Sequence, residues 1–259
     1  MATFIHETAI VSPSANIGED SNIGPFCTVG DEVTIGTGVR LDSHVVVDGK
    51  TTVGDETHVF PFVSIGLAPQ DLKYAGEPTA TEIGKRNHIR EFVTIHRGTQ
   101  GGGGITKIGD DNLLMAQAHV AHDCQIGNNV IMANAATLAG HVEIADRANV
   151  GAYSGVHQFC RVGLEAFIGG YSVVVKDAPP FAIIQGNHAK CFGLNRVGMK
   201  RRGYSRETID KLNRSYHLLL SSKLNTTQAI EKIRKEIADC QEVDLLVDFF
   251  ETSKRGVVK

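Results

Sequence analysis

Aliphatic residues recur at every sixth position along most of this chain. Counting from Ile5, each step of six reaches Ile, Val or Leu as far as Ile65, and the next residue is often glycine or acidic. The same register returns at Ile83 and, after one added residue, runs from Ile108 to Val174. A period of six is typical of short strands joined by tight turns, three strands to a coil, stacked as a parallel β-helix. We expect the aliphatic residue to point inward and its small neighbour to let the chain turn.

Two segments interrupt the repeat. Residues 67–82 carry proline, glycine and charge without the pattern, and residues 97–106 contain four consecutive glycines. Both are predicted to be loops that leave a β-helix spanning residues 1–180. Loops on a rigid scaffold often carry function.

The pattern changes after Pro179-Pro180 to the spacing of amphipathic helices. Ser205 is a candidate N-cap of the first helix, and Gly256 lies near the end of the last. Residues 190–259 are therefore predicted to form a small C-terminal α-helical domain, and the fold as a whole to be mainly β. The apolar positions of the three expected helices are Ile209, Leu212, Tyr216, Leu219 and Leu220, then Ile230, Ile233 and Ile237, then Leu245, Leu246, Phe249 and Phe250.

An 18-residue coil places residues 18 apart in one column. His122 then stacks under Gly140 and Gln158, and Asp123 stacks under His141. Coils are about 4.8 Å apart, so residues on three coils lie within roughly 10 Å along the axis. His119 and His157 flank the same columns, and the stretch from Ala118 to Cys124 becomes the centre of a polar cluster.

Three interpretations of this cluster are open. It could be polar decoration of a solvated face, or a metal site in which His119, His122 and His141 converge. It could also hold a general base, because a histidine near neutral pKa suits deprotonation of a hydroxyl and an adjacent carboxylate fixes its tautomer. A free backbone N–H nearby could hold an oxyanion. No serine in a G-x-S-x-G setting is present, which favours direct transfer over a covalent intermediate.

Composition narrows the functional class. The net charge is −3, which gives no global argument for nucleic acid binding. The charge is uneven, because residues 190–259 hold 15 Lys and Arg against 9 Asp and Glu. Five scattered cysteines indicate reduced thiols in a cytoplasmic protein. We expect no secretory signal and no transmembrane segment.

Seven segments carry recognisable motifs: Gln70–Pro78, Thr94–Thr99, His119–Cys124, Ala136–His141, His157–Cys160, Gln185–Ala189 and Lys200–Gly203. Together these motifs resemble the UDP-N-acetylglucosamine O-acyltransferases, which begin lipid A biosynthesis, and the resemblance covers essentially the whole chain. The hexapeptide repeat alone would be less specific, and the left-handed winding of the β-helix is implied by this resemblance.

The resemblance implies transfer of a (R)-3-hydroxyacyl group from acyl carrier protein to the 3-hydroxyl of UDP-N-acetylglucosamine. It implies a homotrimer with sites between subunits, and no bound metal or cofactor beyond the phosphopantetheine of the carrier. His122 matches the base, Asp123 its orienting partner and Gly140 the oxyanion donor. The positions matching substrate contacts are Asp71, Lys73, His119, His141, His157, Gln158, Gly170, His188, Asn195, Arg201 and Arg202.

The chain departs from the family pattern at two positions. Val197 stands where the family commonly has glutamate near the uridine, and Leu67 follows Gly66 where the family often has glutamate. Gly170 matches the position that gauges acyl length, and a glycine there predicts room for a longer chain. The alternatives are the N-acyltransferase of the same pathway or another hexapeptide acyltransferase, and a histidine-ligated zinc lyase.

Overall fold

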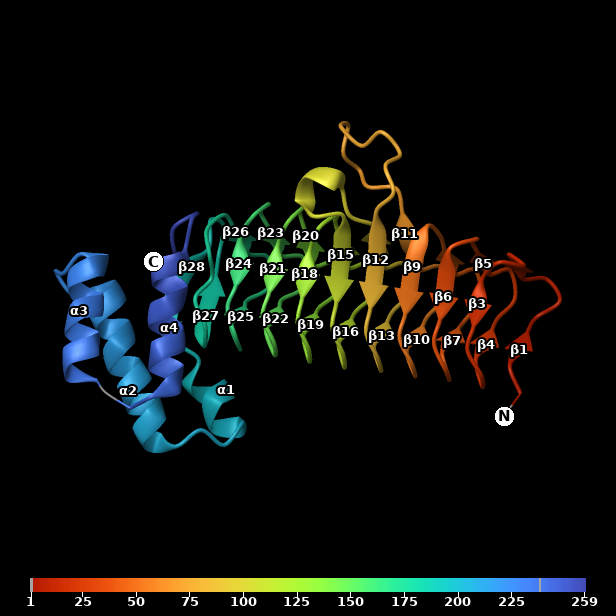
Figure 1. Ribbon diagram of the computed structural model, residues 1–259. Helices are drawn as coiled ribbons and strands as arrows, with labels where there is room; N and C mark the ends of the chain where they lie inside the picture. The colour runs from red at the N-terminus through yellow and green to blue at the C-terminus, as the bar shows by residue number, and fades with distance from the viewer. Residues whose placement is uncertain (1, 238) are drawn as a thin grey trace.

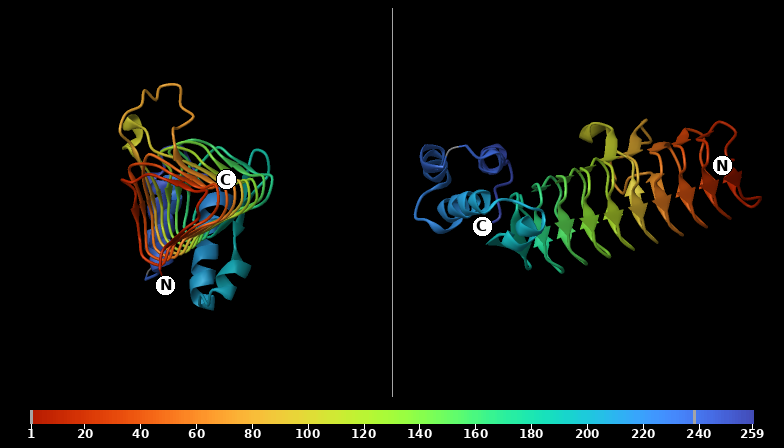
Figure 2. Two further views of the ribbon diagram at one scale, coloured as in Figure 1. Left: turned by 90° about the vertical axis from the view of Figure 1, so that its right-hand side faces the viewer. Right: turned by 90° about the horizontal axis from the view of Figure 1, so that it is seen from below.

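The chain folds as a left-handed parallel β-helix with a small helical domain at its C-terminal end, in a computed structural model that describes residues 2–237 and 239–259 (Figure 1). Seen along its axis, the β-helix is a triangular prism whose three sides are sheets (Figure 2). The predicted fold class is confirmed. The stacked strands of the prism are two to four residues long, as a turn every sixth residue requires.

Each coil passes through the three sheets in the same order, which we call A, B and C. Sheet A contains β1 (Phe4–Ile5), β4 (Asn22–Ile23), β7 (Arg40–Leu41), β10 (His58–Val59), β13 (His88–Ile89), β16 (Leu113–Leu114), β19 (Ile131–Met132), β22 (Asn149–Val150), β25 (Phe167–Ile168), β27 (Ala182–Gln185) and β28 (Lys190–Leu194). Sheet B contains β2 (Ile10–Val11), β5 (Thr28–Val29), β8 (Val46–Val47), β11 (Ser64–Leu67), β14 (Thr94–His96), β17 (His119–Val120), β20 (Thr137–Leu138), β23 (Gly155–Val156) and β26 (Val173–Val174). Sheet C contains β3 (Asn16–Ile17), β6 (Val33–Ile35), β9 (Lys50–Val53), β12 (Ala80–Ile83), β15 (Ile105–Ile108), β18 (Gln125–Ile126), β21 (Glu143–Ile144) and β24 (Arg161–Val162).

The aliphatic residues of the repeat form the core, as predicted. From Ile23 to Val174 each of them is buried, and Ile5 at the open N-terminal end is 45% exposed. Strand pairing follows the expected register of one coil, for example Val120 opposite Leu138. Burial of each such side chain stabilises the fold by about 1.5–3 kcal/mol. Because the register is set by these residues, it also fixes the columns of polar residues outside.

The corners of the prism are not made by the residues the sequence suggested. Most turns are made by the third residue after the inward aliphatic, which has positive φ and is usually not glycine, as at Asp123 and His141. The glycine beside the aliphatic has another cause: a Cβ on Gly18 would lie 2.5 Å from the carbonyl of Gly36 in the next coil. Small residues recur there because neighbouring coils approach closely, not because the chain turns.

Both interruptions of the repeat leave the prism at one edge, between sheets B and C. The expected loops are shorter than predicted, because residues 68–79 connect β11 to β12 and residues 97–104 connect β14 to β15. The two loops project side by side from that edge (Figures 1 and 2). The second loop contains a short 3-10 turn, Gln100–Gly102.

The β-structure continues beyond residue 180, where the sequence placed its end. β27 extends sheet A beside β25, and β28 turns back antiparallel to β27. The helices are α1 (Arg196–Arg201), α2 (Arg206–Tyr216) with a π turn at His217–Ser221, α3 (Thr226–Glu236) and α4 (Gln241–Thr252). Ser205 caps α2 as predicted, whereas α1 was not foreseen. In the described ranges, no helix has the length and hydropathy needed to cross a bilayer.

Candidate active site

His122 and Asp123 form a hydrogen-bonded pair at the edge between sheets B and C, in the turn that joins β17 to β18. His122 Nδ1 lies 2.8 Å from Asp123 Oδ2. The side chain of Asp123 is fully buried and that of His122 is 16% exposed. Since a carboxylate can only accept, this contact assigns the proton to Nδ1. Nε2 of His122 is left as an acceptor, the arrangement that a general base needs.

The loop 97–106 satisfies the rest of the Asp123 carboxylate. Thr99 donates its N–H to Oδ1 at 2.9 Å and its hydroxyl to Oδ2 at 2.6 Å. The N–H of Asp123 donates to Thr106 Oγ1 at 2.8 Å. These partners compensate the burial of a charged group, which would otherwise be costly.

Gly140 lies one coil above His122 and directly against its ring. A Cβ there would come within 2.5 Å of His122 Cε1 and 2.7 Å of Nε2, so any other residue would displace the imidazole. In the described part of the chain, the Gly140 N–H donates to no backbone carbonyl of a turn or strand. That N–H is therefore free to meet an oxyanion beside the free nitrogen of His122.

Two further histidines complete the wall around His122. His141 stacks on Phe159 and meets the His122 ring edge-on at 5.1 Å. Burial lowers the pKa of His141, a nearby Asp123 opposes this, and His122 adds to the lowering. His119 bonds Thr94 through Nδ1 at 2.7 Å, and burial lowers its pKa to about 4, with contributions from His96 and His122.

His96 belongs to this wall and was not among the predicted site residues. It ends β14 at the same edge, is buried, and meets the His119 ring edge-on at 5.1 Å. Burial lowers its pKa as well. Counting repeat positions across the interruption could have found it, because Ile95 stacks under Val120 and His96 therefore lies one coil below the turn that holds His122.

The first loop places Asp71 and Lys73 beside this edge. They line a hollow of about 350 Å³ together with Glu77, Thr99 and Gln100. The charge of Asp71 also acts on His141, raising its pKa slightly against the lowering by burial. His157 and Gln158 are exposed at the same edge, one coil above His141.

The remaining predicted substrate contacts lie elsewhere on the prism. Gly170 and His188 are at the edge between sheets A and B, where Ala189 bonds the carbonyl of Val173. Asn195, Arg201 and Arg202 gather at the edge between sheets C and A, around a pocket of about 340 Å³. One chain therefore does not bring all predicted site residues together.

Arg201 and Arg202, at this pocket, differ in whether they are paired with a carboxylate of the same chain. Arg202 bonds buried Glu165 at 3.1 Å, and Arg147 binds the same carboxylate at 2.9 Å. Asn195 uses its Oδ1 to cap α1 at the N–H of Gly198. Arg201 is exposed at the same pocket, so it is the arginine placed to meet an external anion.

Comparison with known proteins gives a consistent result. Residues 177–258 match the family model described as "Udp N-acetylglucosamine O-acyltransferase; Domain 2", and residues 14–49 and 105–140 match the bacterial transferase hexapeptide model. The structure of LpxA from Acinetobacter baumannii is 48% identical, covers 98% of this chain and 99% of its own, and has a TM-score of 0.97. The chain belongs to the UDP-N-acetylglucosamine acyltransferase family.

More distant members share the whole fold. LpxA from Bacteroides fragilis, described as a UDP-N-acetylglucosamine acyltransferase, is 39% identical with a TM-score of 0.96 over 99% of this chain and 100% of its own. The Arabidopsis UDP-N-acetylglucosamine acyltransferase is 33% identical with a TM-score of 0.87 over 99% and 100%. These matches include both the β-helix and the helical domain, and the protein is an acyltransferase.

The metal interpretation meets a specific difficulty in this acyltransferase. Donor atoms of His122, Asp123 and His141 lie within 4.8 Å of one another, whereas His119 is not in that group. Asp123 Oδ2 already accepts from His122 and from the Thr99 hydroxyl. A cation at this point would have to displace both donors, so a hydrogen-bonded pair explains the geometry better than a ligand set.

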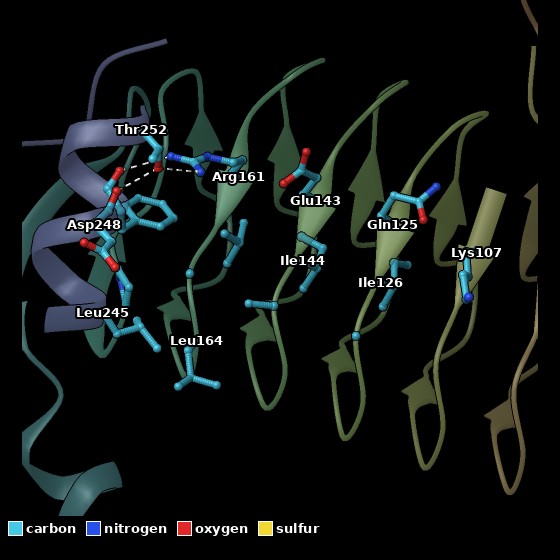
Figure 3. A pocket seen from close by; sticks show the side chains of 16 residues that line it. Lys107, Gln125, Ile126, Glu143, Ile144, Arg161, Leu164, Leu245, Asp248 and Thr252 are labelled. Carbon is cyan, nitrogen blue, oxygen red and sulfur yellow. Dashed lines mark hydrogen bonds between the residues drawn. The ribbon is translucent and has the colours of Figure 1, made fainter. Parts of the chain in front are cut away.

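A cavity of about 530 Å³ lies away from these histidines, between sheet C and α4 (Figure 3). Arg161 crosses it to the helix, stacks over Phe249 at 4.5 Å, and bonds Thr252 Oγ1 and the Phe249 carbonyl. Its guanidinium also pairs with buried Asp177 at 3.3 Å. The lining combines aliphatic residues with the charged side chains of Lys107, Glu143, Arg161 and Asp248, and the cavity marks where the helical domain meets the prism.

Proposed function

We propose that this acyltransferase moves a (R)-3-hydroxyacyl group from acyl carrier protein to the 3-hydroxyl of UDP-N-acetylglucosamine, the first step of lipid A biosynthesis. The observation that carries the proposal is the His122–Asp123 pair with the free N–H of Gly140 against its ring. The family membership supports the choice of substrates, and the geometry is the one that a general base beside an oxyanion donor requires.

In the proposed reaction the oxygen of the sugar 3-hydroxyl attacks the carbonyl carbon of the thioester. His122 Nε2 accepts the proton of that hydroxyl at the same time. Asp123 holds the Nδ1 proton and stabilises the imidazolium. The Gly140 N–H donates to the carbonyl oxygen, which carries the negative charge. The carbon–sulfur bond then breaks, and His122 returns the proton to the phosphopantetheine sulfur. The chain needs no redox group, because atoms and charge balance without one.

The helical domain is proposed to receive the acyl carrier protein. Residues 190–259 carry the excess of positive charge, and Arg196, Lys200 and Arg206 line one pocket with a single carboxylate, Asp210. Carrier proteins of this kind are acidic, so complementary charge would speed their encounter and fix their orientation. The proposed place of the reaction is the cytoplasm.

The proposed site lies between copies in a homotrimer. The His122 group and the Arg201 group occupy different edges of one prism, separated by sheet C, and six residues of extended chain span about 20 Å. A second copy packed by three-fold symmetry could bring its Arg201 edge to the first copy's His122. Gly170, with only Ala152 within 4 Å of a Cβ placed on it, would then leave room for the acyl tail.

The test is an acyl transfer assay with UDP-N-acetylglucosamine and carrier-bound 3-hydroxyacyl donors of several lengths. His122→Ala should lower kcat at least 100-fold with little change in KM, because a positioned base contributes about 10²–10⁴. His6→Ala, at the open end of the prism, is the control. An active His122→Ala variant would refute the mechanism. Stoichiometric zinc in the purified protein would favour a lyase. A strong preference for donors of ten over fourteen carbons would contradict the role given to Gly170.

A further inference from the structure

Thr99 is the residue through which the glycine-rich loop contacts the proposed catalytic pair. It is buried and directs two donors at one carboxylate, the N–H to Asp123 Oδ1 and the hydroxyl to Oδ2. Oδ2 is also the atom that accepts the Nδ1 proton of His122. The Thr99 hydroxyl and the His122 ring therefore share one oxygen of Asp123.

The rest of the loop is shaped to bring Thr99 there. A Cβ on Gly102 would lie 2.0 Å from the carboxyl carbon of Asp123, and one on Gly98 would lie 2.8 Å from Oδ1. Only glycines let the loop backbone lie directly on the carboxylate. Thr106, at the far end of the loop, accepts the N–H of Asp123, so both ends of the loop are tied to the same residue.

The loop with Asp71 and Lys73 braces this arrangement from outside. Glu77 accepts the Ala75 N–H at 2.8 Å within its own loop and the Gln100 N–H at 3.4 Å from the other. Gln100 follows Thr99 directly, so this contact holds the loop segment whose Thr99 N–H and hydroxyl donate to Asp123.

We propose that Thr99 is a positioning residue, which orients Asp123 and reduces the negative charge that Asp123 presents to His122. This inference rests on the proposed function. Hydrogen bonds to an ionised carboxylate spread its charge. With the Thr99 hydroxyl in place, Asp123 stabilises the imidazolium less than a carboxylate with a single partner would. Thr99 thereby sets how strongly Asp123 holds the imidazolium that forms when His122 accepts a proton.

The experiment separates this role from that of a loop anchor. Thr99→Val keeps the shape and loses the hydroxyl, Thr99→Ala loses both, and Thr99→Ser keeps the hydroxyl. Thr57→Val is the matched control, because Thr57 is also buried and its hydroxyl donates to a backbone carbonyl, that of Gly84, at a different edge. The readouts are the pKa of His122, from NMR titration of protein carrying 13C-labelled histidine, and the pH dependence of kcat.

Thr99→Val and Thr99→Ala should raise the pKa of His122 by about half to one pH unit, the equivalent of one hydrogen bond. The pH at which kcat falls on the acid side of its profile should rise by the same amount. At the optimum, kcat should fall about tenfold with KM unchanged. Thr99→Ser and Thr57→Val should titrate as the parent does. If Thr99→Val and Thr99→Ala leave the pKa of His122 unchanged, or if Thr99→Ser behaves as Thr99→Val does, the proposal is wrong.

The titration needs no substrate. If the parent protein transfers no acyl group in the assay, the proposed function fails, while the pKa of His122 in the Thr99 variants still decides whether Thr99 acts on the pair. If Thr99→Val does not fold, Thr99→Ala supplies the same comparison.

Discussion

His119 and His122 are three residues apart, and their surroundings set them different tasks. His122 has one nitrogen on Asp123 and the other free beside Gly140. His119 is packed against His96 and bonded to Thr94, and burial holds its pKa at about 4. It is therefore neutral under physiological conditions, so it adds no positive charge beside the imidazolium that His122 forms in the proposed mechanism.

The lowered pKa of His119 predicts a loss of stability in mild acid. The unfolded chain binds a proton near pH 6.5 and the folded one only near 4, so stability is complete above 6.5 and falls as the pH drops. Between pH 7 and 5 this residue should remove about 2 kcal/mol from the free energy of unfolding. His119→Gln should lose less stability over that interval in urea titrations, whereas His88→Gln, at an exposed position, should match the parent. Equal pH dependence in all three proteins would contradict the assignment.

The stacking of His122, Gly140 and His141 could be predicted because a strict period converts sequence distance into position. Thr99 could not be placed in this way, since residues 97–106 have no repeat and their path depends on how glycines pack on Asp123. The role of Asp123 as a left-handed corner was also hidden. Positive φ is rare for a residue that is not glycine, and here the coil geometry imposes it.

At the scale of elements, Arg161 links α4 to the prism through several contacts at once. Arg161 reaches from β24 to the end of the helix, where it stacks on Phe249 and bonds two oxygen atoms (Figure 3). Its partner Asp177 is buried and also accepts from Ser253, just beyond α4. Removal of the guanidinium leaves that carboxylate with an incomplete set of donors.

Arg161→Met should therefore destabilise the docking of α4. The stem is preserved, but the hydrogen bonds and the aromatic contact are lost, a cost of about 1–3 kcal/mol. Amide hydrogen exchange should become faster in α4 while the prism core is unchanged. The control is Arg234→Met, which removes the exposed ion pair between Arg234 of α3 and Glu251 of α4. It should lower the free energy of unfolding by less than about 1 kcal/mol. Similar exchange rates for the two variants would show that Arg161 is not the anchor.

Helices α2 and α3 were predictable because their caps and apolar spacing agree. Ser205 and Asn225 each bond the third residue of the following helix. Strand β28 and helix α1 were not, because the repeat ends before them and neither has a period of its own. β28 is held by pairing with β27, and α1 begins at a local cap by Asn195 but is held to the prism by the Arg202–Glu165 contact, which is tertiary.

At the scale of the whole molecule, the predicted substrate contacts are distributed over three edges of one prism. A trimer with shared sites predicts that two inactive variants can restore each other. His122→Ala and Arg201→Glu should each be inactive alone. In randomly mixed trimers about a quarter of the interfaces join an intact His122 to an intact Arg201. Co-expressed variants with different affinity tags should thus recover about a quarter of the parent activity, and no recovery in a mixed trimer would place the site within one chain.

The two loops also have a consequence for how this enzyme could change its substrates. Each leaves and rejoins the prism at one corner, and the strands on either side still pair with the coils above and below, as β11 does with β8 and β12 does with β9. Loop length adds little to the cost of closure. Evolution or design can therefore replace the residues between β11 and β12 without disturbing the inward column, provided that the contact of Glu77 with Gln100 is kept. The predicted substrate contacts Asp71 and Lys73 and the His122–Asp123 pair can then change separately within one chain.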